Sequence, residues 1–209
     1  MEKRVIFIDH QDESVFLSYL KEYLLPKDPA KLSKIANNPN SSPAEKSDAL
    51  KALRLNNFAL DIDLMAYCLM SNHWHLLIRQ KHQRAIEQFM RSLCTRYVQY
   101  FNHRHGKRVG GLFQDTYKAV LVTSEEQLLH LSRYIHRNPF QKGLSLKESP
   151  HASSYINYLK IIDQDWVKPK EILGFFTKTG TNSYESFCEN HLIDEASASI
   201  MKETVIDID

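Results

Sequence analysis

Cysteine is scarce in this chain of 209 residues. The three cysteines, Cys68, Cys94 and Cys188, lie far apart, and none belongs to a Cys-x-x-Cys pair. This pattern argues against a disulfide framework and a cysteine zinc site, so we expect a reducing, cytoplasmic location. Long apolar runs are also missing. No stretch approaches the roughly 20 residues that span a bilayer, and the N-terminus lacks the apolar region of a signal peptide, so we expect neither.

Charge is distributed unevenly along the chain, although the formal net charge is only +2. Between Arg79 and Lys142 there are twelve Lys or Arg and four Asp or Glu, whereas the rest of the chain has an acidic excess. A basic middle segment fits a polyanionic partner such as nucleic acid. A solvated helix face explains the same charges equally well, so charge alone leaves the two readings open.

The order of predicted elements indicates an α+β protein with an antiparallel sheet and helices packed on it. Strands are expected over residues 3–9, 58–70, 74–80 and within 107–122. Helices are expected over residues 12–25, 84–106 and 124–138, with shorter ones near 42–53 and after residue 150. We expect a catalytic domain over residues 1–150, with an insertion at about 26–55, and a helical C-terminal extension over 151–209 with an acidic tail.

Local signals predict where several helices begin and end. Asp12 could cap the first helix, and the pairs Ser42 with Glu45 and Thr123 with Glu126 have the pattern of capping boxes. Gly106 is expected to end the long basic helix.

The segment "YCLMSNHWHLLI" places two histidines in an apolar strand. Residues two apart in a strand point to the same side, so His73 and His75 share a face and Trp74 takes the other. Two imidazoles at this spacing could converge on one divalent metal. A single His-x-His is a weak motif, and two hydrogen-bonded histidines at a sheet edge are the simpler alternative.

The helix over 124–138 carries a second set of polar residues. Leu128, Leu131 and Ile135 form its predicted buried stripe, with Tyr134 at the margin and Asn138 one turn further on. Tyr134 could attack an electrophile held by a metal at the histidines, and Asn138 could be a third ligand. On the residues alone, a tyrosine at the edge of the core and an asparagine at the helix end remain the more economical explanation.

Two motifs in this order resemble the single-tyrosine HUH transposases. Within this family, the chain looks like the REP-associated tyrosine transposases and related small insertion-sequence transposases. The first motif matches the family pattern at Tyr67, Leu69, Met70, Asn72, His73, His75, Leu76 and Leu77. The second, "YIHRNPFQKGL", matches at Tyr134, Ile135, Asn138, Pro139, Gly143 and Leu144. The sequence departs from the family at Ser71, where proline is usual, at "FQK", where Val-Arg-Ala is usual, and in the insertion.

The resemblance implies a ferredoxin-like fold and a metal-dependent enzyme that nicks and joins single-stranded DNA, with DNA hairpins as substrate. It implies that His73, His75 and Asn138 hold Mg²⁺ or Mn²⁺ and that Tyr134 forms a 5′-phosphotyrosine. Family members include monomers and homodimers with shared active sites, so a homodimer stays open.

Basic side chains along the middle segment could follow the DNA backbone. The candidates are Arg91, Arg96, Arg104, Arg108, Lys118, Arg133 and Arg137. Arg133 and Arg137 flank Tyr134 and could instead lower its pKa or hold phosphates. Aromatic residues among them could stack on bases, although the same residues fit a buried stripe.

Two other functions stay open. One is a domesticated DNA-hairpin-binding protein without transposition activity. The other is an unrelated metal hydrolase that combines the His-x-His pair with His82, His103 or His105. A covalent DNA adduct would distinguish the transposase from both.

Overall fold

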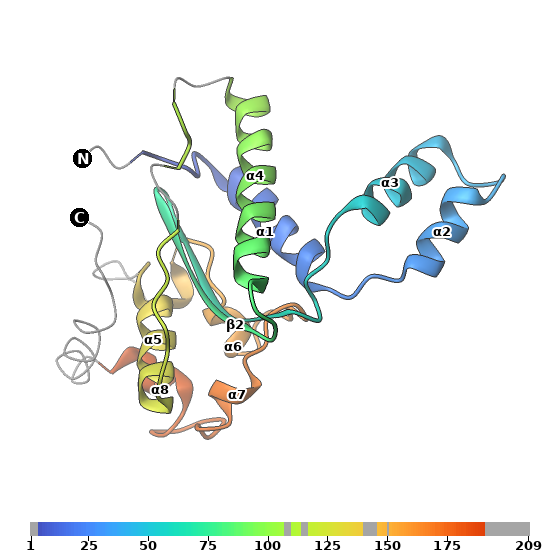
Figure 1. The fold of residues 1–209 in the computed structure, drawn as a ribbon. Helices are drawn as coiled ribbons and strands as arrows, with labels where there is room; N and C mark the ends of the chain where they lie inside the picture. The colour runs from blue at the N-terminus through green and yellow to red at the C-terminus, as the bar shows by residue number, and fades with distance from the viewer. Residues whose placement is uncertain (1–3, 107–109, 114–116, 140–145, 150, 191–209) are drawn as a thin grey trace.

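A computed structural model describes residues 4–106, 110–113, 117–139, 146–149 and 151–190 (Figure 1). Its elements in chain order are α1 (His10–Leu24), α2 (Pro29–Asn37), α3 (Pro43–Arg54), β1 (Ile62–Met70), β2 (His73–Gln80), α4 (Ala85–His105), α5 (Glu125–Arg137), the 3₁₀ turn η1 (Leu146–Glu148), α6 (Tyr155–Tyr158), α7 (Lys170–Leu173) and α8 (Tyr184–Glu189). None of these described helices combines the length and apolar character needed to cross a bilayer.

The two strands form an antiparallel pair, which confirms the α+β class and the predicted hairpin around Ser71 and Asn72. In its register Cys68 lies opposite His75, and Met70 lies opposite His73. Two other strand predictions are wrong in the described residues, since 4–9, 110–113 and 117–122 are not strands. The ferredoxin-like topology stays a prediction.

The outer edge of β1 is covered by chain from the C-terminal part. The Leu69 N–H donates to the Ala152 carbonyl at 2.8 Å, and the Ser154 N–H donates to the Tyr67 carbonyl at 3.0 Å. Further along, the Lys168 N–H donates to Leu64 at 2.8 Å. These bonds satisfy backbone groups that an open strand edge would leave to solvent or to another chain.

One face of the sheet packs on α1 and α4 through aromatic residues. The Trp74 ring lies 4.9 Å from that of Phe16 on α1, and the Phe16 ring lies 5.2 Å from that of Tyr97 on α4. Phe16 and Tyr97 are fully buried, and the Tyr97 hydroxyl donates to the Ile6 carbonyl at 2.6 Å. Trp74 is therefore committed to this core, which leaves the neighbouring histidines to the other face.

A buried carboxylate joins the start of α1 to the end of α4. Asp9, not Asp12, caps α1, and Asp12 is instead fully buried. Its carboxylate accepts from the Arg104 guanidinium at 2.5 Å and the Tyr100 hydroxyl at 3.0 Å, and it contacts a ring nitrogen of His105 at 3.0 Å. Burial works to raise the pKa of Asp12, but these hydrogen bonds outweigh it and hold the pKa below its usual range.

The segment 26–55, which was predicted to be an insertion, contains the helical hairpin α2–α3, which projects away from the sheet in Figure 1. The predicted capping box of Ser42 and Glu45 is confirmed at the start of α3. Helix α2 was expected to be a polar connection, but Asp28 caps it and Pro29 occupies its first turn.

The C-terminal part packs into the same core as the rest. Buried side chains from Ile6 to Cys188 form one hydrophobic cluster, which includes Tyr155, Ile172 and Tyr184. The short helices predicted after residue 150 are confirmed as α6, α7 and α8. The predicted acidic tail lies outside the described residues.

Candidate active site

The two histidines lie together on the sheet face opposite Trp74, as strand alternation predicts. The ring centroids of His73 and His75 are 5.0 Å apart, and the planes are nearly perpendicular at 88°. His73 is exposed and His75 is partly buried. One rigid strand therefore presents two imidazoles side by side.

Hydrogen bonds orient both rings. His73 Nδ1 lies 2.7 Å from the Asn72 Oδ1, so Nδ1 carries the proton and Nε2 is the basic nitrogen. The Asn138 amide donates to His75 Nε2 at 3.0 Å, which requires that nitrogen to be unprotonated. Burial, helped by the neighbouring His73, lowers the pKa of His75 to about 4. His75 therefore presents a neutral nitrogen, the form that binds metals.

Helix α5 brings Tyr134 and Asn138 to this face. The Tyr134 ring centroid lies 5.5 Å from that of His75. The helix begins one residue later than expected, because Ser124 is the cap and Gln127 accepts from the backbone of Thr123. The predicted capping box of Thr123 and Glu126 is therefore wrong, but the helix span was predicted within one residue at each end.

The donor set at this face fits a divalent metal with oxygen and nitrogen ligands. His73 Nε2, His75 Nε2 and the Asn138 side chain come from two adjacent elements. A half-turn of the Asn138 amide would replace its NH₂ group by Oδ1 at the same position, which would change a donor into a ligand. Within the described residues, no three His, Cys, Asp or Glu side chains form a group that could hold a metal. A metal here would therefore rely on the amide and on water or substrate oxygens.

Arg133 and Arg137 direct their guanidinium groups toward α8. Arg133 is only 2% exposed and donates to the Phe187 carbonyl at 2.8 Å and to that of Asn190. Arg137 donates to the Cys188 carbonyl at 2.9 Å. In this arrangement both arginines have intramolecular roles, and Arg133 has almost no surface to offer to DNA.

The remaining predicted DNA contacts divide by exposure. Arg91 and Lys118 are exposed, and Arg91 pairs with Glu87 at 2.9 Å. Arg96 pairs with Glu22 at 2.7 Å, and Arg104 bridges Asp9 and Asp12. Arg108 lies outside the described residues.

The aromatic residues considered for base stacking mostly belong to the core. Tyr97 and Phe101 are fully buried, and the Phe113 ring packs 4.9 Å from Trp74. Two of the three histidines of the hydrolase alternative, His82 and His105, have partners away from the His73 and His75 pair. His105 contacts Asp12, and His82 lies 3.6 Å from Asp61.

A buried histidine on α5 was not identified from the sequence. His136 has no exposed surface, and its two ring nitrogens each lie 2.7 Å from a hydroxyl, those of Tyr184 and Ser154. Burial lowers its pKa to about 3. Its position beside the stripe residue Ile135 was the only local signal, and its two partners are distant in sequence.

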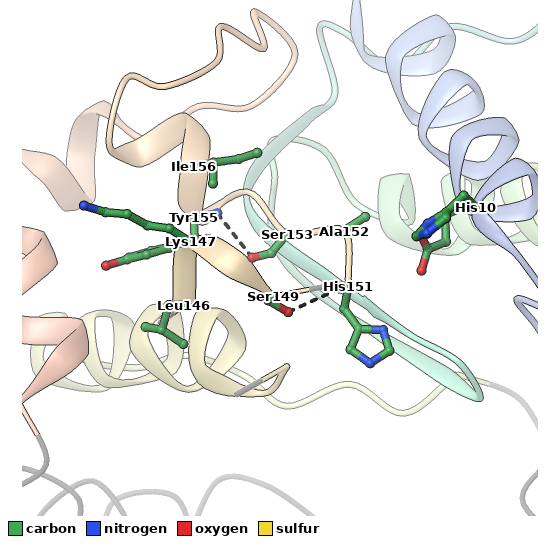
Figure 2. Close-up of a pocket in the computed structure, with 10 residues that line it drawn as sticks. His10, Leu146, Lys147, Ser149, His151, Ala152, Ser153, Tyr155 and Ile156 are labelled. Carbon is green, nitrogen blue, oxygen red and sulfur yellow. Dashed lines mark hydrogen bonds and ion pairs between the residues drawn. The ribbon is translucent and has the colours of Figure 1, made fainter. Parts of the chain in front are cut away.

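A hollow of about 250 Å³ lies where α1 meets the segment that covers the edge of β1 (Figure 2). His10 lines it from α1, and His151 lines it from the covering segment. Its two serine hydroxyls are used in local turns: Ser149 accepts from the His151 N–H, and Ser153 accepts from the Tyr155 N–H. We therefore interpret the hollow as the seam between these two segments.

Comparison with protein families gives one match. The family described as "Transposase IS200 like" matches residues 46–138, which contain most of α3, both strands, α4 and α5, and end at Asn138. No curated protein and no solved structure matches the chain.

Proposed function

We propose that this protein, whose residues 46–138 form an IS200-like transposase domain of the HUH single-tyrosine transposase family, cuts and rejoins single-stranded DNA through Tyr134. The family assignment makes it a transposition-related DNA nuclease. The observation that supports the detailed mechanism is the convergence of Tyr134, Asn138, His73 and His75 on one sheet face. DNA hairpins are the proposed substrate.

In the proposed reaction, the Tyr134 oxygen attacks the scissile phosphorus and loses its proton to solvent. The bond between phosphorus and the 3′ oxygen breaks, and that oxygen takes up a proton as a free 3′-OH. The product is a 5′-phosphotyrosine. Because the ester linkage is kept, another 3′-OH can attack it and release Tyr134, so strand transfer needs no nucleotide hydrolysis.

The family is metal-dependent in general, and we propose Mg²⁺ or Mn²⁺ for this chain. His73, His75 and Asn138 would hold the ion, which when bound neutralises phosphate charge and orients the phosphate toward the nucleophile. Asn72 serves this site by fixing the ring of His73.

We propose that the catalytic domain extends over residues 1–150, beyond the matched range. Helix α1 precedes that range, yet its Phe16 packs directly on Trp74 of the histidine strand. The exposed Arg91 and Lys118 are the proposed contacts to the DNA backbone.

A covalent-trapping gel tests the proposal. Labelled single-stranded DNA carrying hairpins from the flanks of the gene is mixed with protein and Mn²⁺, then denatured. We expect a shifted band with the parent protein and with Tyr117→Phe, a matched control that removes the same oxygen from an exposed tyrosine. The band should vanish in Tyr134→Phe and with a chelator.

A band that persists in Tyr134→Phe would overturn the assignment of the nucleophile. Tight hairpin binding without any adduct would instead favour the DNA-hairpin-binding protein that lacks transposition activity.

A further inference from the structure

Hydrogen bonds hold helix α5 in place on two sides. Toward the site, Asn138 bonds to His75. Away from it, Ser132, Arg133 and His136 are all buried, at 0%, 2% and 0% exposure. Buried polar side chains on a helix carry a large desolvation cost unless each is paired, so their partners determine where the helix can sit.

The bonds around His136 form one directional chain. Tyr184 donates to Ser132 at 3.1 Å, and Ser132 donates to the Leu129 carbonyl at 2.7 Å. Because the Tyr184 hydroxyl donates its one proton to Ser132, it accepts a hydrogen bond from His136 Nδ1. A neutral ring protonated at Nδ1 accepts at Nε2, which is where the Ser154 hydroxyl lies. The Ser154 hydroxyl also lies 3.3 Å from the Tyr67 carbonyl, so its one proton is shared between two acceptors.

The chain also reaches the sheet. The Ser154 oxygen accepts from the Tyr67 N–H on β1 at 2.9 Å. His136 therefore connects α5 to β1 through Ser154 and to α8 through Tyr184. Cys68, the next residue of β1, lies opposite His75 in the strand register.

Two arginines of α5 hold the end of α8. The last carbonyls of a helix lack partners within it and favour cations. Arg133 and Arg137 donate to such carbonyls at Phe187 and Cys188, and Arg133 also reaches Asn190. A short helix of six residues thus receives some of its stabilising contacts from the helix that carries Tyr134.

We propose that segment 184–190 is a positioning element for the nucleophile, with His136 as the positioning residue that links it to the sheet. Tyr134 and Asn138 stand two residues before and after His136, so a shift of α5 displaces both from His75. The segment holds α5 against the histidines of its own chain, and Tyr134 acts there. This inference rests on the proposed function and assigns that site a structural support outside the matched family range.

Two variants test the positioning role in the full-length protein. His136→Ala removes the link, and Tyr184→Phe removes one hydroxyl of the chain while keeping its ring. A Leu20→Ala variant, at a fully buried position of α1, is the control for general loss of stability. All are compared at a temperature where each is folded.

We expect His136→Ala to slow single-turnover adduct formation by a factor of about 10 to 100, the range for sub-ångström to ångström misplacement of a reacting group. Tyr184→Phe should have a smaller effect in the same direction. Hairpin affinity should stay within about twofold, and Leu20→Ala should match the parent rate. An unchanged rate in His136→Ala, or an equal loss in Leu20→Ala, would overturn the inference.

Mixing two inactive proteins tests the assignment of Tyr134 to its own chain. Tyr134→Phe and His75→Ala should remain inactive together. Adduct formation by the mixture would show that the tyrosine reaches the histidines of another chain and would overturn the inference.

Hydrogen exchange separates this inference from the proposed function. We expect amides of α5 to exchange at least about tenfold faster in His136→Ala, and those of α1 to be unchanged. This result would stand even if the parent protein formed no adduct, in which case the proposed nuclease mechanism alone would fail. Unchanged exchange across α5 would overturn the positioning role.

Discussion

Replacing His136 by glutamine should remove a specific acid sensitivity from the protein. His136 is buried among hydroxyl groups and stays neutral, with its pKa lowered by burial from an ordinary 6.5 to about 3. In the unfolded chain the His136 ring binds a proton near pH 6.5, whereas in the folded chain the ring stays neutral to a much lower pH. The stability that depends on a neutral His136 is therefore complete above pH 6.5 and is lost as the pH falls toward 3.

The size of the effect follows from the pKa difference. At pH 4.5 the imidazole is charged in the unfolded chain and still neutral in the folded one. The free energy of unfolding therefore changes over roughly two pH units, from 6.5 to 4.5. Two units correspond to roughly 3 kcal/mol. The free energy of unfolding of the parent should therefore fall by roughly 3 kcal/mol more than that of His136→Gln between pH 7.5 and 4.5. The glutamine variant cannot titrate, and all other groups contribute to both proteins.

Urea unfolding at a series of pH values measures this difference. The glutamine variant should start less stable at neutral pH, because it cannot reproduce both ring hydrogen bonds, and the two curves should converge in acid. Parallel curves would refute the reasoning, since they would mean that His136 is protonated or solvated in the folded protein.

Three further outcomes are expected. Asp12→Asn should lower the free energy of unfolding by about 2–3 kcal/mol in urea titrations, because it removes the buried charge that accepts from Arg104 and Tyr100, while Arg104 keeps its pair with Asp9. The exposed Asp48→Asn should change it by less than about 1 kcal/mol, and equal losses would contradict this. Mn²⁺ titration by calorimetry should show at least about tenfold weaker binding in His75→Ala, and a similar loss in a variant of an exposed histidine would show that the site lies elsewhere. Arg91→Gln should lessen the salt dependence of hairpin binding by roughly one unit of slope, and an unchanged slope would remove Arg91 from the DNA path.

The local pattern of the chain determined much of the architecture around the site. Strand alternation placed His73 and His75 on one face and Trp74 on the other, and the structure confirms this. Helical periodicity predicted α4 and α5 nearly to the residue, and Gly106 ends α4 with φ of +85° as expected. These features depend on neighbours within a few residues, so they can be read directly from the sequence.

Tertiary structure decided the roles of the polar side chains. Asp12 has the pattern of a helix cap, yet it is buried against Arg104 at the far end of α4. Arg133 looks like a charge beside the nucleophile, yet it holds the end of α8. His136 has only its position beside Ile135 as a local signal, because its partners come from segments 18 and 48 residues away. A polar side chain takes whichever partner the fold brings close, and that partner's distance in sequence is invisible to any local pattern.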